Sequence, residues 1–109
     1  MILEFTESAA KDRKRLKAHA RTFDDAYRAF VEAAQAFRAT NTPFPAKFRV
    51  KGVEGAKGVF EFTWSFTGPD GRATFEWDDV VIDAGAEPPT HDTVLRVRRV
   101  GDHGIFTNP

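Results

Sequence analysis

Residues 93–106 read TVLRVRRVGDHGIF, in which arginine alternates with β-branched and aliphatic residues ahead of a glycine. Such alternation predicts a β-strand, because successive side chains of a strand point to opposite faces of its sheet. Arg96 and Arg98 therefore share one face, while the apolar residues between them join a core on the other. Gly101 ends the strand, and His103 follows two residues later. A column of guanidinium groups that ends at a histidine suits a polyanionic ligand and proton transfer near neutral pH.

Length and composition limit the classes of protein to which the chain can belong. With 109 residues it can build one hydrophobic core but not two, so residues 1–109 are expected to form a single domain. It has no cysteine, and neither a disulfide framework nor a thiolate metal site is expected. No apolar run approaches the ~18 residues that cross a bilayer. The opening residues MILEFTES lack the pattern of a signal peptide, so we expect a cytoplasmic protein with no membrane partner.

The formal net charge is zero, but the two halves of the chain differ in sign. Residues 1–57 hold 12 Lys and Arg against 7 Asp and Glu, and residues 58–109 hold 4 against 9. A chain with this asymmetry can still present one basic face to an anion. The neutral total makes a nucleic-acid-binding protein less expected without excluding it.

Two helices are expected after a short strand at residues 2–5. The first, at residues 7–20, has a narrow apolar side and is otherwise densely basic. This basic surface is either a solvated helix face, which is the commoner case, or a contact surface for phosphate or an acidic partner. Its basic residues are Lys11, Arg13, Lys14, Arg15, Lys17 and Arg21.

The second helix has clearer start and stop signals. Thr22 can cap it, acidic residues occupy its first turn, and Arg38 lies in its last turn. We expect a helical hairpin joined around Arg21 and Thr22, followed by a rigid connector at Pro43 and Pro45. The apolar positions of the second helix repeat as one helical face that must cover another layer: Phe23, Tyr27, Phe30, Val31, Ala34 and Phe37.

Three strand-like segments lie between the helices and the last strand. Residues 47–51 alternate over a short length, and residues 59–66 (VFEFTWSF) and 72–78 (RATFEWD) alternate strictly. The GPDG sequence at residues 68–71 predicts the turn that joins the last two as a hairpin. Residues 80–82 either extend that hairpin or belong to the connection leading to the last strand.

These elements predict an α+β fold, in which an N-terminal helical hairpin packs on a twisted, mainly antiparallel sheet of four or five strands. Aromatic residues of the two alternating strands face the helices. On the outward face we expect Arg72 and Glu61 beside Arg96 and Arg98, with His103 at the rim. Alternating arginine and glutamate on a sheet face is also typical of cross-strand ion pairs, so a purely structural role for these charges stays open.

The chain resembles the RelE/ParE superfamily of bacterial toxin–antitoxin systems over nearly its whole length. In ribonuclease branches of that superfamily, the last strand runs into a glycine, a variable residue and a catalytic histidine, followed by an aromatic residue. Gly101, His103 and Phe106 match this form. Four segments carry the resemblance: FTESAAKDRKRL, VKGVEGAKGVFEFTW, GRATFEWD and VLRVRRVGDHGIF.

The resemblance implies a role for particular residues of the outward face. Arg72 matches the arginine that binds the scissile phosphate, and His103 matches the general acid or base. Glu61 is the candidate partner, either as base or as a group that orients a donor. No spacing of His, Asp and Glu suggests a metal site, and no cofactor is expected. The residues expected to bind RNA are Arg96, Arg98, Lys51 and Phe106.

The function expected on this basis is that of a toxin that cleaves mRNA as a metal-independent endoribonuclease, at the ribosome. Its expected partners are a cognate antitoxin protein and mRNA on the ribosome. Two alternatives stay open, a ParE-like inhibitor that binds DNA gyrase without hydrolytic chemistry, and a relative whose activity has weakened. Phe106 favours the alternative of weakened activity, because relatives often carry a hydrogen-bonding tyrosine where this chain has phenylalanine.

Overall fold

A five-stranded mixed sheet forms the centre of the molecule, and the computed structural model describes it in residues 1–66 and 71–109. The strand order is β1-β5-β4-β3-β2. β1 runs parallel to β5, and every other neighbouring pair is antiparallel. The strands are β1 (Ile2–Phe5), β2 (Lys51–Gly52), β3 (Val59–Thr63), β4 (Arg72–Asp83) and β5 (Thr90–Gly101). The expected α+β fold with a mainly antiparallel sheet is confirmed.

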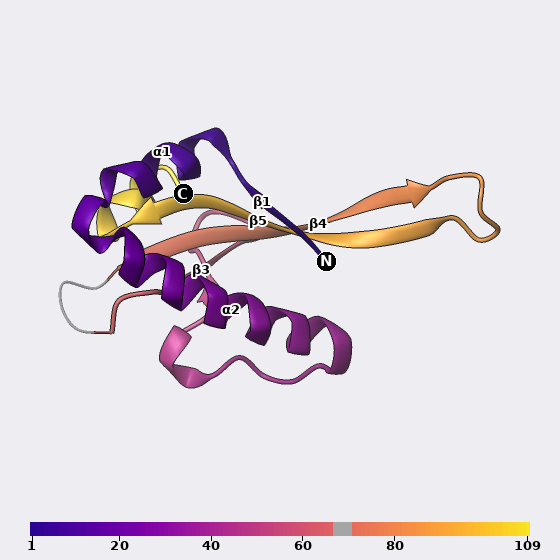
Figure 1. The fold of residues 1–109 in the computed structure, drawn as a ribbon, viewed down its shortest axis with the longest axis horizontal. Coiled ribbons are helices and arrows are strands. Elements are labelled where there is room, and N and C mark those ends of the chain that lie inside the picture. Colours follow the sequence, from indigo (N-terminus) through magenta and orange to yellow (C-terminus); the bar gives the residue numbers. More distant parts are fainter. Residues whose placement is uncertain (67–70) are drawn as a thin grey trace.

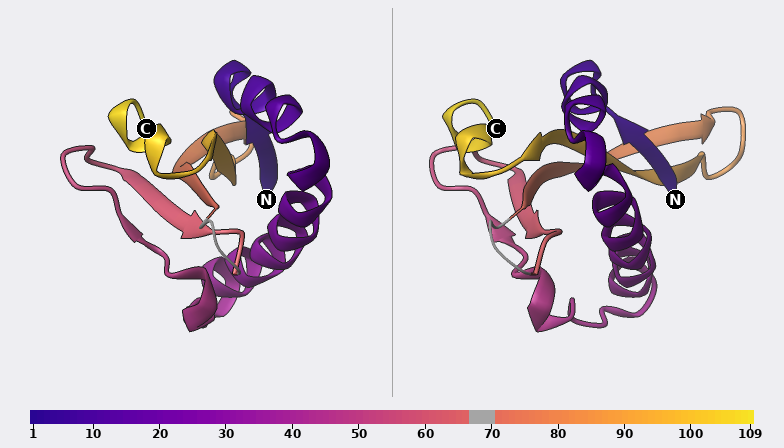
Figure 2. Two further views of the ribbon diagram at one scale, coloured as in Figure 1. Left: turned by 90° about the vertical axis from the view of Figure 1, so that its left-hand side faces the viewer. Right: turned by 60° about the vertical axis from the view of Figure 1, so that its left-hand side comes forward.

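The helices lie together on one side of this sheet, and the C-terminal turn lies on the other (Figure 2). α2 is the longest element, and it crosses the sheet below β4 and β5 in the view of Figure 1. The helical elements are α1 (Glu7–Arg15), α2 (Ala20–Thr40) and the short 3-10 helices η1 (Lys17–His19), η2 (Ala46–Phe48) and η3 (His103–Thr107). η3 is therefore the element that adjoins the sheet face left open by the helices.

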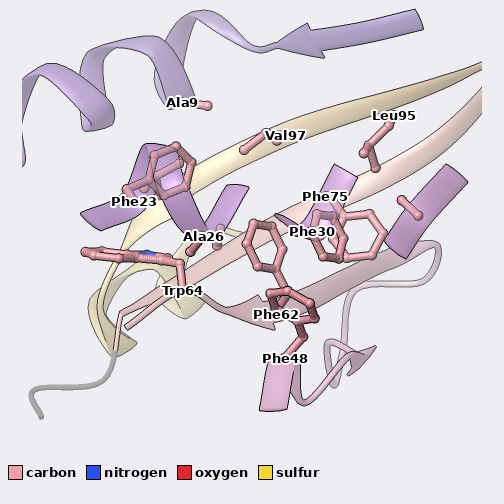
Figure 3. Close-up of a cluster of buried hydrophobic side chains, with 13 residues drawn as sticks. Ala9, Phe23, Ala26, Phe30, Phe48, Phe62, Trp64, Phe75, Leu95 and Val97 are labelled. Carbon is pink, nitrogen blue, oxygen red and sulfur yellow. The ribbon is translucent and has the colours of Figure 1, made fainter. Parts of the chain in front are cut away.

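Phe30 of α2 is the centre of the core (Figure 3). Its ring stacks on Phe62 of β3 with 3.9 Å between ring centroids, and it meets Phe75 of β4 edge-on at 5.1 Å. Phe23 and Ala34 lie on the same helical face and are fully buried, as the period of the sequence predicts. Alternation along β3 and β4 brings Phe62 and Phe75 to this side and sends their neighbours to the opposite face.

The helical hairpin is joined earlier than the sequence suggests. Lys17 adopts a left-handed conformation with φ of 53°, and this residue ends α1 and leads into η1. α2 consequently begins at Ala20, so the expected junction at Arg21 and Thr22 and the expected cap by Thr22 are wrong. The sequence does not indicate this break, because Lys17 is not a glycine and a non-glycine residue rarely takes a positive φ. Asn41, also left-handed at φ 58°, ends α2.

The strand boundaries differ from expectation at both ends of the sheet. Residues 47–51 mostly lie in η2 and a turn, because Arg49 is left-handed, and only Lys51 and Gly52 pair as a strand. The extension of β4 through residues 80–82 is confirmed. β5 pairs with it from Thr90 onward, so the two strands form a ribbon that projects beyond the rest of the sheet (Figure 1). The expected turn at residues 68–71 lies, apart from Gly71, outside the described residues.

Asp12 ties α1 to the end of β5. Its carboxylate is buried and accepts hydrogen bonds from Arg99 Nε at 2.7 Å, from a terminal nitrogen of Arg99 at 3.2 Å and from the Val100 backbone N–H at 3.0 Å. The hydrogen bond that Arg99 donates to Asp12 raises the pKa of the Arg99 guanidinium above its usual value. The pair fixes the part of β5 that leads into Gly101 and η3.

We expect Asp12→Ala to lower the free energy of unfolding by about 3 kcal/mol, because it leaves a partly buried guanidinium and a backbone N–H without their acceptor. Urea denaturation of the purified protein measures this loss. Asp25→Ala is the matched control, because Asp25 is an exposed carboxylate whose ion pair with Arg28 spans 3.8 Å. Equal stability of the two variants would show that Asp12 does not hold β5.

Candidate functional site

Arg72 begins β4 at the end of the sheet nearest η3. It pairs with Thr63 on one side and with Gly101 on the other. Its guanidinium donates a hydrogen bond of 2.8 Å to the Thr63 hydroxyl, and only 7% of the residue is exposed. The expected outward direction holds by strand alternation, but the side chain is buried rather than displayed to solvent. Trp64 helps to set this position, because its indole N–H donates to the Arg72 carbonyl at 2.9 Å.

His103 lies close in the chain to the strand partner of Arg72, since Gly101 precedes it by two residues. The residue is exposed, and its ring meets Phe106 edge-on at 5.7 Å between centroids. Asp102 begins η3 by accepting a 2.8 Å hydrogen bond from the Gly104 N–H. Ile105 is buried against Gly101, where a side chain would come within 2.8 Å of its methyl group. These contacts hold the histidine at the edge of the open sheet face.

Glu61 lies in the next row of the same face, between Lys51 of β2 and Thr74 of β4. The carboxylate is mostly buried, and Lys51 Nζ lies 3.7 Å from it. Thr74 is fully buried, and its hydroxyl has no hydrogen-bond partner within residues 1–66 and 71–109. Thr63 and Thr74 were not expected from the sequence as members of the site. Their only signal in the sequence is a polar side chain between apolar neighbours of an alternating strand.

Arg96 and Arg98 are surrounded by acceptors. Arg96 Nε donates to Glu4 at 2.8 Å, and its guanidinium also reaches Glu76 at 3.6 Å and Asp78 at 3.3 Å. The hydrogen bond that Arg96 donates to Glu4 is the main reason that the pKa of Arg96 is raised. Arg98 donates to Glu76 at 3.2 Å and to the Pro109 carbonyl at 3.0 Å. The cross-strand ion pairs that the sequence left open are therefore present, and an RNA strand would compete with these carboxylates.

The structure thus brings the candidate residues to one face of the sheet, where Arg72 and Glu61 are buried and His103 is exposed. Arg72, Glu61 and Lys51 lie on strands β4, β3 and β2, and His103 and Phe106 lie on η3.

In the described parts of the chain, no three His, Asp or Glu side chains lie close enough to share a metal ion. None of the described helices is long and apolar enough to cross a membrane.

No protein-family model matches the sequence, and no curated protein matches it either. Solved structures do match its three-dimensional arrangement. A chain of the DinJ–YafQ complex from E. coli superposes with a TM-score of 0.59 at 16% identity, over 94% of this chain and 92% of the matched one. A YoeB/ParE toxin from Agrobacterium tumefaciens superposes with the same TM-score at 15% identity, over 94% and 99% of the two chains.

The chain has the RelE/ParE toxin fold. The structure of YafQ alone from E. coli gives the same TM-score of 0.59 at 16% identity. The resemblance inferred from the sequence is thereby confirmed at the level of the fold. Because so few residues are identical, the RelE/ParE toxin fold establishes the arrangement of the elements, and the chemistry has to be argued from the side chains.

Proposed function

We propose that this protein is the toxin of a toxin–antitoxin pair and that it cleaves mRNA as a metal-independent endoribonuclease, with Arg72, His103 and Glu61 at the reacting phosphate. One observation carries the proposal. The pairing of Arg72 with Gly101 brings a buried guanidinium and an exposed imidazole to the same end of the sheet face that the helices leave open. The RelE/ParE toxin fold supports the assignment to toxins.

The reaction needs only groups that this face supplies. The 2′-oxygen of the RNA attacks the adjacent phosphorus, a base accepts its proton, and an acid protonates the departing 5′-oxygen as the P–O5′ bond breaks. The guanidinium of Arg72 stabilises the charge that grows on the phosphoryl oxygens. His103 donates or accepts a proton, since its ring is accessible to solvent. Glu61 serves as the second proton-transfer group or orients a donor.

Substrate binding falls to Lys51, Arg96, Arg98 and Phe106 in this proposal. The three cations already face carboxylates, so their attraction for free RNA is weak. Phe106 offers a ring face for a base, with His103 beside it. A strand held by the ribosome suits such a surface, because the ribosome would fix the geometry of the mRNA and supply further contacts to it.

Arg72→Lys tests the phosphate role directly. Lysine keeps the positive charge but cannot reproduce the planar fork, so turnover should fall at least about 10-fold while ribosome binding changes little. Cleavage of mRNA on translating ribosomes and co-sedimentation with ribosomes measure the two quantities. Since Arg72 is buried, the melting temperature of the variant is recorded beside that of Arg21→Lys, which changes an exposed arginine on α2. Unchanged turnover would remove Arg72 from the reaction.

A second candidate function is inhibition of DNA gyrase by binding alone. The ion pairs that neutralise Arg96 and Arg98 favour it, because a protein that performs no phosphate chemistry has no need of accessible cations on this face. Gyrase supercoiling and mRNA cleavage are therefore assayed on one preparation. Gyrase inhibition without cleavage would replace the nuclease proposal, and the absence of both activities would indicate a relative that has lost activity.

The proposed protein partner is an antitoxin. The matched structure of YafQ is a complex with DinJ, which supports a protein partner for this chain too. The exposed basic residues of α1 and η1 suit an acidic segment of such a partner, among them Lys11, Lys14 and Lys17. We place its contact partly over Arg72 and His103, where it would block the substrate.

A further inference from the structure

A pocket of about 520 Å³ lies away from the proposed cleavage residues, between the last turns of α2, the connector at residues 43–50 and strand β2. The connector runs back beneath α2 to η2 (Figure 1). Phe44 and Pro45 of the connector are among the residues that line the pocket. The volume lies within the range that holds a small organic ligand.

The walls of this pocket are mainly aromatic. Phe37 of α2 stacks on Phe44 of the connector at 5.0 Å, and Phe37 also stacks on Trp77 of β4 at 6.3 Å. Phe60 of β3 and Val50 complete the apolar lining. All five side chains are only partly buried, so the pocket is an open apolar surface with a fixed shape. Such walls bind the flat or extended body of an apolar molecule.

The charged side chains of the lining are all cationic, and no acidic residue contributes to it. Arg38 lies over the Trp77 ring at 5.1 Å and donates to the Thr93 hydroxyl at 3.1 Å. Lys51 pairs with Glu61 across 3.7 Å. The exposed guanidinium of Arg49 has no hydrogen bond or ion pair to any other described residue. The pocket therefore keeps one cation available for an anionic group.

Arg49 is also held in an unfavourable backbone conformation. Its φ of 48° and ψ of 46° are left-handed, a conformation that is unfavourable for a residue with a side chain and not for glycine. Buried Phe48 fixes the chain immediately before it, and the Arg49 N–H closes the turn on the Ala46 carbonyl at 3.0 Å. A residue that lines a pocket in a strained backbone conformation is a candidate for a functional role of its side chain.

We propose that this pocket binds a small amphipathic carboxylate, with its apolar body among Phe37, Phe44 and Trp77 and its carboxylate on Arg49. Both parts of the ligand follow from the lining, since aromatic walls exclude a purely polar anion and the cationic mouth disfavours a cation. Lys51 links the pocket to the open sheet face, because this residue lines the pocket and its ammonium pairs with Glu61. The inference does not depend on the nuclease proposal.

Decanoate is the probe, and 1-decanol is its uncharged counterpart. Isothermal titration calorimetry should give one decanoate per chain and at least about 10-fold weaker binding of decanol, the scale of a charge-assisted hydrogen bond. Binding should also change the fluorescence of Trp77, which lines the pocket. Equal affinity for the two probes, or no saturable binding of decanoate, would overturn the proposal.

Arg49→Gly separates loss of the charge from loss of the fold. Glycine accepts the left-handed conformation, so the melting temperature should not fall, while decanoate affinity should drop about 10-fold. Arg21→Ala, an exposed arginine outside the pocket, should leave the affinity unchanged. Ala46→Trp fills the pocket from an exposed position of η2 and should abolish binding. Wild-type affinity in either Arg49→Gly or Ala46→Trp would show that decanoate binds elsewhere.

Discussion

Replacing His103 by alanine should lower mRNA cleavage by about 100-fold or more, the scale expected when a general acid or base is removed. The fold should be unaffected, because the side chain is exposed and its ring contact is an edge-on approach to Phe106. η3 would keep its anchor, since Ile105 remains buried and Asp102 still caps the turn. The measurement is the cleavage rate of mRNA on translating ribosomes, with the variant and the wild type side by side.

His91→Ala is the matched control for this experiment. His91 is an exposed histidine on the projecting β4–β5 ribbon, at a distance along β5 from Gly101 and η3. Its loss should leave both cleavage and melting temperature unchanged. If His103→Ala cleaves mRNA as fast as His91→Ala does, His103 has no part in the reaction, and Glu61 would have to act with a group supplied by the ribosome.

Phe30→Ala should destabilise the protein by about 3–5 kcal/mol, the range for removing a large aromatic side chain from a core. Phe30 is fully buried, stacks on Phe62 and approaches Phe44, Phe48 and Phe75. The cavity would therefore open where α2, the connector and two strands meet, and no single neighbour could fill it. Urea denaturation monitored by circular dichroism gives the free energy of unfolding.

Phe66→Ala serves as the reference for that measurement. Phe66 is 52% exposed, and its ring centroid lies 6.1 Å from that of Phe48 in the core. Its removal should cost less than about 1 kcal/mol. Similar losses for the two variants would mean that the stacked cluster on α2 is not the main source of stability.

Patterns with a fixed period were read correctly from the sequence. The helical spacing of Phe23, Phe30 and Ala34 and the alternation of Phe62 and Phe75 each identify a buried face, because the backbone geometry imposes those periods. The single-residue events were missed. The left-handed Lys17 and Arg49 moved a helix junction and removed most of a strand, and nothing in their side chains announces a positive φ.

For the candidate site too, the sequence predicted the face on which a side chain lies but not the residues that it contacts. Alternation indicated that Arg72 and Arg96 share the outward face, but it does not indicate which residues form hydrogen bonds or ion pairs with them there. Arg96 is paired with Glu4, 92 positions away in the chain, because β1 enters the sheet parallel to β5. Arg72 is buried, and Thr63 on the neighbouring strand accepts one of its hydrogen bonds. Such partners are a consequence of topology, which the local pattern does not encode.

The projecting β4–β5 ribbon also bears on the solubility of the protein. Beyond Glu76, β4 has no further described strand on its outer side, and Val81 and Ile82 are 54% and 60% exposed. An unpaired apolar edge of this kind is a template for strand addition and aggregation. Asp79 and Asp83 flank the apolar pair, and their like charges repel a second ribbon. We therefore expect rising ionic strength, which screens these charges, to increase association through the ribbon.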